Sequence, residues 1–120
     1  MGSVLVVDDS ATERKILSSY LQELGITVST AETGEEALEK IHASHPDLIV
    51  LDVVLPGKSG FEVCRELKSN EETNKIPIII CSTKGSEMDK FWGMKQGADA
   101  YIAKPINKEE FLDAVKKLLR

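Results

Sequence analysis

Polar residues suited to chemistry follow apolar runs at four places in this 120-residue sequence. One run is followed by two aspartates, another by one aspartate, and two others by a serine and a lysine: Asp8, Asp9, Asp52, Ser82 and Lys104. If the runs are parallel β-strands, their carboxyl ends share one edge of the sheet, which is where open α/β folds bind ligands. Each residue alone is an ordinary cap or loop residue, but together they predict one site.

The three carboxylates indicate a metal site. Carboxylates within about 4 to 6 Å of one another repel unless a cation neutralises them. A pocket of oxygen ligands without histidine or cysteine suits Mg²⁺, which also leaves room for a phosphoryl oxygen. Asp52 is then the candidate nucleophile, because a carboxylate can accept a phosphoryl group as an acyl phosphate. Lys104 and Ser82 are placed to meet charge on the phosphoryl oxygens.

The elements that position these residues are short apolar runs alternating with amphipathic stretches, five of each. This alternation predicts an α/β fold with a parallel sheet covered by helices on both faces, in one domain over residues 1–120. Continuous apolar runs predict central strands, whereas an alternating run and a short last run predict edges. The expected central strands are 4–7, 48–51 and 78–81, and the expected edge strands are 26–30 and 100–103.

The helices are predicted from apolar residues at helical spacing and from capping residues at their starts. The expected caps are Ser10, Thr33 and Asn107, and the expected left-handed stops are Gly25 and Gly97. The expected buried stripes are Ile16, Leu17, Tyr20, Leu21 and Leu24, then Ala37, Leu38 and Ile41, then Phe111, Leu112, Val115, Leu118 and Leu119.

Composition narrows the class of protein. The net charge of -5 argues against direct nucleic-acid binding, which uses basic surfaces. No apolar run is long enough to span a bilayer, so we expect a cytoplasmic protein without membrane contact. Cys64 and Cys81 fall inside a helical and a strand pattern, which indicates reduced core thiols and not a disulfide framework.

Four segments resemble the signature blocks of the response regulator receiver family, whose members include CheY-like regulators. These segments are Val6–Ser10, Leu51–Gly57, Cys81–Thr83 and Ala103–Pro105. The resemblance implies a doubly wound, flavodoxin-like (βα)5 sandwich with strand order 2-1-3-4-5. It also implies a two-component phosphorelay in which Asp52 accepts a phosphoryl group from a sensor histidine kinase or a histidine phosphotransfer protein.

The same resemblance implies roles for individual residues. Asp9, Asp52 and the backbone carbonyl of Val54 are expected to ligate Mg²⁺, and Asp8 is expected to help through a bound water. Lys104 is expected to contact the phosphoryl group, and the peptide bond that follows it is expected to be cis. Val54 and Lys84 occupy positions that tune phosphoryl lifetime in the family, and Val54 offers no side-chain hydrogen bond to an attacking water.

The resemblance also makes Ser82 and Tyr101 a switch pair. Ser82 is expected to turn toward the phosphoryl group, and Tyr101 is expected to move from an exposed to a buried rotamer. The output face, where an effector protein binds, is then the fourth helix, fifth strand and fifth helix. Trp92 either lies exposed there or is buried with Phe91 in a broad stripe. Segments 89–93 and 96–98 resemble stand-alone regulators of pilus-motility and chemotaxis-like pathways.

Other classes of function share some of these features. A Mg²⁺-dependent phosphatase also uses an aspartate nucleophile at a strand end, but Val54 stands where such enzymes often carry an acid/base carboxylate. A protein-binding module that never uses phosphate has no need of the intact acidic set. A flavodoxin-like redox domain needs a phosphate-binding loop where Asp8 and Asp9 would repel an anionic cofactor. We therefore expect a phosphoacceptor that catalyses only its own phosphorylation and dephosphorylation, and not a turnover enzyme.

Overall fold

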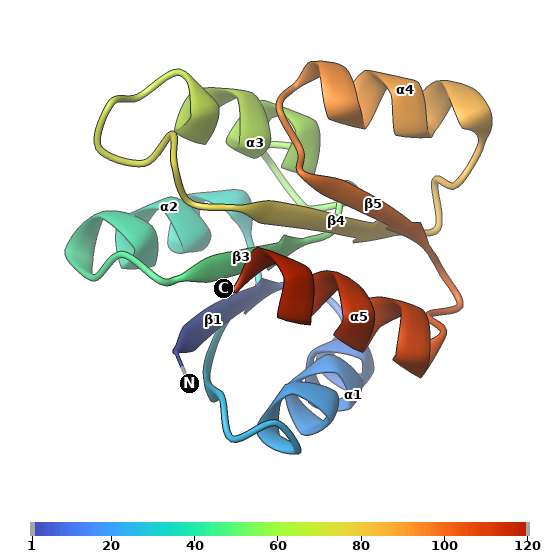
Figure 1. Cartoon of the computed structure of the whole chain (residues 1–120). Coiled ribbons are helices and arrows are strands. Elements are labelled where there is room, and N and C mark those ends of the chain that lie inside the picture. The colour runs from blue at the N-terminus through green and yellow to red at the C-terminus, as the bar shows by residue number, and fades with distance from the viewer. Residues whose placement is uncertain (1, 120) are drawn as a thin grey trace.

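The apolar runs pair into one parallel sheet in the computed structural model, which describes residues 2–119 (Figure 1). Its strand order is β2-β1-β3-β4-β5, which confirms the predicted topology. In register, Val4 of β1 lies between Val28 of β2 and Leu48 of β3. The strands are β1 (Ser3–Val7), β2 (Thr27–Ala31), β3 (Leu48–Leu51), β4 (Ile78–Ser82) and β5 (Ala100–Ala103).

The burial of each strand follows from its composition. Every residue of β3 and β4 is buried, and so are the last four residues of β1, because helices cover both faces of the sheet there. In β2 the residues Thr27 and Ser29 face solvent while Ala31 is buried, as expected for an edge strand. The outer edge of the sheet on the opposite side is β5.

Two helical layers enclose the sheet (Figure 1). On one face α1 and α5 bury Leu17, Leu21, Phe111 and Val115, and on the other α2 and α3 pack their apolar residues against β1, β3 and β4. Within residues 2–119, no helix has the length and apolar composition needed to cross a membrane. The helices are α1 (Ala11–Gln22), α2 (Gly34–Ala43), α3 (Gly60–Lys68), α4 (Glu87–Lys95) and α5 (Lys108–Leu118).

Side-chain caps begin the helices. The three predicted caps accept hydrogen bonds from backbone amides three residues on: Ser10, Thr33 and Asn107. Two further caps, which were not predicted, are Ser59 and Ser86, and they form reciprocal capping boxes at the starts of α3 and α4. Gly25 and Gly97 adopt φ values of 76° and 105°, which confirms their predicted left-handed conformation.

One predicted stripe residue is not in the core. Ile16 of α1 is 38% exposed, because the helix turns Leu17 and Leu21 toward the sheet and leaves Ile16 on its flank. Cys64 and Cys81 are buried free thiols, as predicted. Burial raises the pKa of Cys64 to about 11 and also raises that of Cys81, so both stay protonated near neutral pH.

Candidate functional site

Three carboxylates meet at the carboxyl edge of the sheet. Asp8 and Asp9 follow β1, and Asp52 follows the adjacent strand β3. Each offers one carboxylate oxygen, and these oxygens all lie within 4.8 Å of one another. Asp8 and Asp52 are buried, whereas Asp9 is exposed. The predicted convergence of these residues is therefore confirmed. Asp8 and Asp52 form the buried part of the site, and Asp9 forms the part that is exposed to solvent.

Lys104 balances the charge of the two buried carboxylates. Its Nζ lies 2.7 Å from Asp8 Oδ2 and 3.0 Å from Asp52 Oδ2, and only 8% of its side chain is exposed. Burial alone lowers the pKa of Lys104, but the hydrogen bonds to Asp8 and Asp52 outweigh it and leave the pKa raised. Lys104 is therefore a fixed positive charge at the site.

The main chain orients the same two carboxylates. Asp8 Oδ1 accepts a hydrogen bond from the Ser10 amide at 2.9 Å, and Asp52 Oδ1 accepts one from the Val54 amide at 3.2 Å. Each carboxylate thus has one oxygen on the backbone and the other on Lys104. The guanidinium of Arg14 donates to the main-chain carbonyl of Asp8 at 2.8 Å, which the sequence analysis did not anticipate.

The donor set suits a hard divalent cation. The cluster offers carboxylate oxygens and contains neither a thiolate nor an imidazole. In Asp8 and Asp52, one oxygen accepts from a backbone amide and the other from the Lys104 ammonium, so a cation that binds either carboxylate would share an oxygen with one of these donors. Asp9 adds a carboxylate that makes no ion pair with Lys104 among residues 2–119. The acidic pocket can therefore hold a metal ion of the kind that the sequence predicts.

The predicted switch pair is joined through one residue of the loop after β4. The buried Ser82 Oγ accepts a hydrogen bond from the Lys84 amide at 3.2 Å, and the Tyr101 hydroxyl donates one to the Lys84 carbonyl. Burial, with contributions from Asp89 and Asp52, raises the pKa of Tyr101 to about 12, so the phenol is a neutral donor near pH 7. Tyr101 is partly buried, and it bonds to the same residue whose amide donates to Ser82.

Trp92 and Phe91 are both exposed on α4. Their exposed fractions are 50% and 55%, which excludes the alternative in which a broad stripe buries both. The reason is that α4 turns Gly93, its single buried residue over Glu87–Lys95, toward the sheet. Val54, beside the acidic site, is also 49% exposed.

Gly60 makes close backbone packing possible under Asp52, a role that the sequence analysis missed. A Cβ at Gly60 would lie 2.0 Å from the main-chain carbonyl oxygen of Asp52. The Gly60 amide also donates to the Val53 carbonyl at 2.9 Å. The available signal is a glycine in the stretch between two predicted strands, where a helix is expected, because glycine is a poor helix former. The peptide bond between Lys104 and Pro105 is cis, as predicted.

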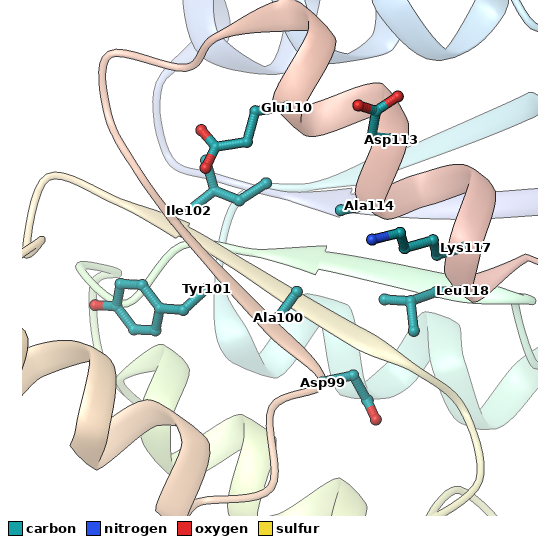
Figure 2. Close-up of a pocket in the computed structure, with 9 residues that line it drawn as sticks. All are labelled: Asp99, Ala100, Tyr101, Ile102, Glu110, Asp113, Ala114, Lys117 and Leu118. Carbon is teal, nitrogen blue, oxygen red and sulfur yellow. The ribbon is translucent and has the colours of Figure 1, made fainter.

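An open groove of about 470 Å³ lies between β5 and α5 (Figure 2). None of the acidic-site residues lines it. Tyr101 contributes to its lining, but its ring points to the other side of β5 from α5 (Figure 2). The charged side chains that line the groove are Asp99, Glu110, Asp113 and Lys117. The groove is therefore a mainly acidic feature of the predicted output face, and the predicted phosphoryl chemistry does not use it.

Comparison with known proteins places these features in context. The model of the response regulator receiver domain matches residues 4–116. Protein PilH of Pseudomonas aeruginosa is 40% identical over 119 residues, which cover 99% of this chain and 98% of that protein. Transcriptional regulatory protein ResD of Bacillus subtilis is 41% identical over 98% of this chain, which spans only 48% of the length of ResD. Chemotaxis protein CheY4 of Vibrio cholerae superposes with a TM-score of 0.91 at 35% identity, covering 99% of each chain.

Proposed function

Because this chain belongs to the response regulator receiver family, we propose that it is a phosphorylation-activated regulator in which Asp52 accepts a phosphoryl group from a histidine kinase or phosphotransfer protein. The observation that carries the proposal is the placement of Asp52. Its carboxylate lies 3.0 Å from the Lys104 ammonium and forms a cluster with Asp8 and Asp9. This arrangement supports roles for Asp52 as a nucleophile, for Lys104 as a fixed cation and for the three carboxylates as a metal-binding set.

In the proposed reaction, a carboxylate oxygen of Asp52 attacks the phosphorus of a phosphohistidine. The new O–P bond forms as the N–P bond breaks, and the imidazole nitrogen leaves with the bonding electron pair and takes up a proton from water. The Val54 amide holds Asp52 Oδ1, and Lys104 holds Oδ2. Lys104 can remain bonded to Asp8 while it meets the charge that reaches the phosphoryl oxygens.

We assign Mg²⁺ as the metal of this site. Asp9, Asp52 and the Val54 carbonyl would hold it, with Asp8 acting through a water. When bound, Mg²⁺ supplies positive charge to a phosphoryl oxygen and offsets the repulsion among the three carboxylates. Asp9 supports this assignment, because its exposed carboxylate extends the cluster toward solvent, from which the ion and the phosphodonor arrive.

The proposed output face comprises α4, β5 and α5, where the effector binds. The acidic residues Asp99, Glu110 and Asp113 line its groove, so a partner with basic residues is favoured. Trp92 offers an exposed aromatic anchor on α4, the kind of side chain that often dominates binding energy. The two buried free thiols fit a reducing compartment, and the proposal places the protein in the cytoplasm.

The phosphatase alternative and the proposal predict different outcomes in one experiment. Intact mass is measured after incubation with acetyl phosphate and Mg²⁺, alongside an Asp52→Asn control. The proposal expects one added phosphoryl group per molecule in the parent and none in the control. Continuous release of phosphate from phosphomonoesters would favour the phosphatase. An unlabelled parent, under conditions that label a known receiver, would overturn the proposal.

A further inference from the structure

Helix α4 is attached to the sheet in an unusual way. Its four large apolar residues are 48% to 73% exposed: Met88, Phe91, Trp92 and Met94. Over Glu87–Lys95 the single buried residue is Gly93, which has no side chain. The helix therefore contacts the sheet mainly through its backbone at this point. The position of α4 then depends strongly on the group that packs against Gly93.

The group that packs against Gly93 is the ring of Tyr101. A Cβ built on Gly93 would lie 2.6 Å from Tyr101 Cδ2 and 2.7 Å from Cε2, both closer than real Cβ atoms approach. The next atom, Ile80 Cδ1, would be 3.3 Å away at the flexible end of its side chain. The Tyr101 ring is also tethered, because its hydroxyl donates to the Lys84 carbonyl in the loop before α4.

We infer that Gly93 is a positioning residue that permits the inward rotamer of Tyr101 and couples this rotamer to the placement of α4. This inference rests on the proposed function, in which Tyr101 responds to phosphate on Asp52. Phosphate favours the inward rotamer, in which the ring packs against Gly93 beneath α4. In the outward rotamer this packing is lost, so the helix and its exposed residues shift between the two rotamers. Phosphate is then detected by a partner through the position of α4, and not only through the exposure of Tyr101.

Unfolding temperature tests the steric part of the inference. An alanine within a helix normally stabilises it relative to glycine, by about 4 °C for a domain of this size. Gly93→Ala should instead lower the unfolding temperature, because its methyl group displaces the Tyr101 ring. In a Tyr101→Ala background, the same Gly93→Ala change should raise it, because only the flexible end of Ile80 must adjust.

The sign reversal separates a specific contact from general damage to α4. If Gly93→Ala lowers the unfolding temperature equally with and without the Tyr101 ring, the inference is wrong. If Gly93→Ala alone does not fold, recovery of folding in the double variant supports the inference, and failure of the double variant overturns it.

Trp92 tests the coupling itself, because it is the single tryptophan of the chain and adjoins Gly93 on α4. Acetyl phosphate and Mg²⁺ should change its fluorescence in the parent. Gly93→Ala should abolish this change while intact mass shows undiminished labelling of Asp52. Met94→Ala is the matched control on the same helix, and it should keep both the label and the fluorescence change.

The two measurements distinguish the inference from the proposed function. Absence of label on Asp52 in the parent would refute the proposed function, and the unfolding temperatures would still decide whether Gly93 accommodates the ring. A labelled parent with unchanged Trp92 fluorescence, or a labelled Gly93→Ala variant with the full change, would overturn the coupling.

Discussion

Replacing Lys104 with methionine should destabilise the metal-free protein by about 3 kcal/mol, at the low end of the cost of removing one partner from a buried ion pair. The Lys104 ammonium lies within 3.0 Å of two carboxylates, and all three side chains are at most 8% exposed. Methionine retains much of the buried volume but leaves Asp8 and Asp52 without a counter-charge. For a domain of this size, the loss corresponds to a fall of about 12 °C in unfolding temperature.

Magnesium should reverse part of this loss. In the parent, the ammonium is bonded to Asp8 Oδ2 and Asp52 Oδ2, and in Lys104→Met those oxygens are released. Binding at 100 times the dissociation constant stabilises a folded protein by about 2.7 kcal/mol. Urea unfolding with EDTA and with saturating Mg²⁺ should therefore show a larger stabilisation by Mg²⁺ in the variant than in the parent.

The matched control for this experiment is Lys108→Met. Lys108 also makes a 2.9 Å ion pair, with Glu23, but 45% and 53% of the two side chains are exposed. Exposed pairs contribute little, because water screens them, so this variant should resemble the parent with and without Mg²⁺. A stability of Lys104→Met within about 1 kcal/mol of the parent in EDTA, about a third of the expected cost, would refute this prediction. Equal stabilisation of Lys104→Met and the parent by Mg²⁺ would refute it as well.

Two further substitutions test the surroundings of Asp52. Val54→Asn should speed the loss of phosphate from Asp52 about fivefold, because one hydrogen bond to the attacking water is worth about 1 kcal/mol. The decay of the phosphorylated mass over time measures this rate. An equal or faster decay in the parent would contradict the prediction. Gly60→Ala should lower the free energy of unfolding in urea by about 3 kcal/mol, because its Cβ would lie 2.0 Å from the Asp52 carbonyl oxygen. A stability close to that of the parent would show that this backbone contact relaxes easily.

The order of the sheet and the edge that holds the site were predictable because local pattern and topology agree. Continuous apolar runs are buried on both faces, and parallel strands end together, so a residue placed after β1 or β3 reaches the same edge. The sequence alone therefore predicts that Asp8, Asp9 and Asp52 lie together. Asp52 is far from Asp8 and Asp9 along the chain, but the adjacent strand ends bring carboxylate oxygens of all three within 4.8 Å of one another.

Helix α4 was less predictable because its pattern is ambiguous. Phe91 and Trp92 are adjacent, so helical periodicity allowed either a broad buried stripe or an exposed face. Which of the two forms depends on the side chains of the sheet that lie beneath the helix. Tyr101 occupies that space with its ring, so only glycine fits above it and the larger side chains turn outward.

Residue types and their order along the chain thus determined the family, the fold and the strand ends that bring the acidic set and its lysine together, and they predict Ser82 and Tyr101 as a switch pair. Tertiary structure decided which oxygen faces which partner. It placed Lys104 between Asp8 and Asp52, joined Ser82 and Tyr101 through Lys84, and packed the Tyr101 ring against Gly93. The physical reason is that periodicity specifies the face of an element, whereas a contact of 3 Å depends on the side chains that other elements bring to the same place.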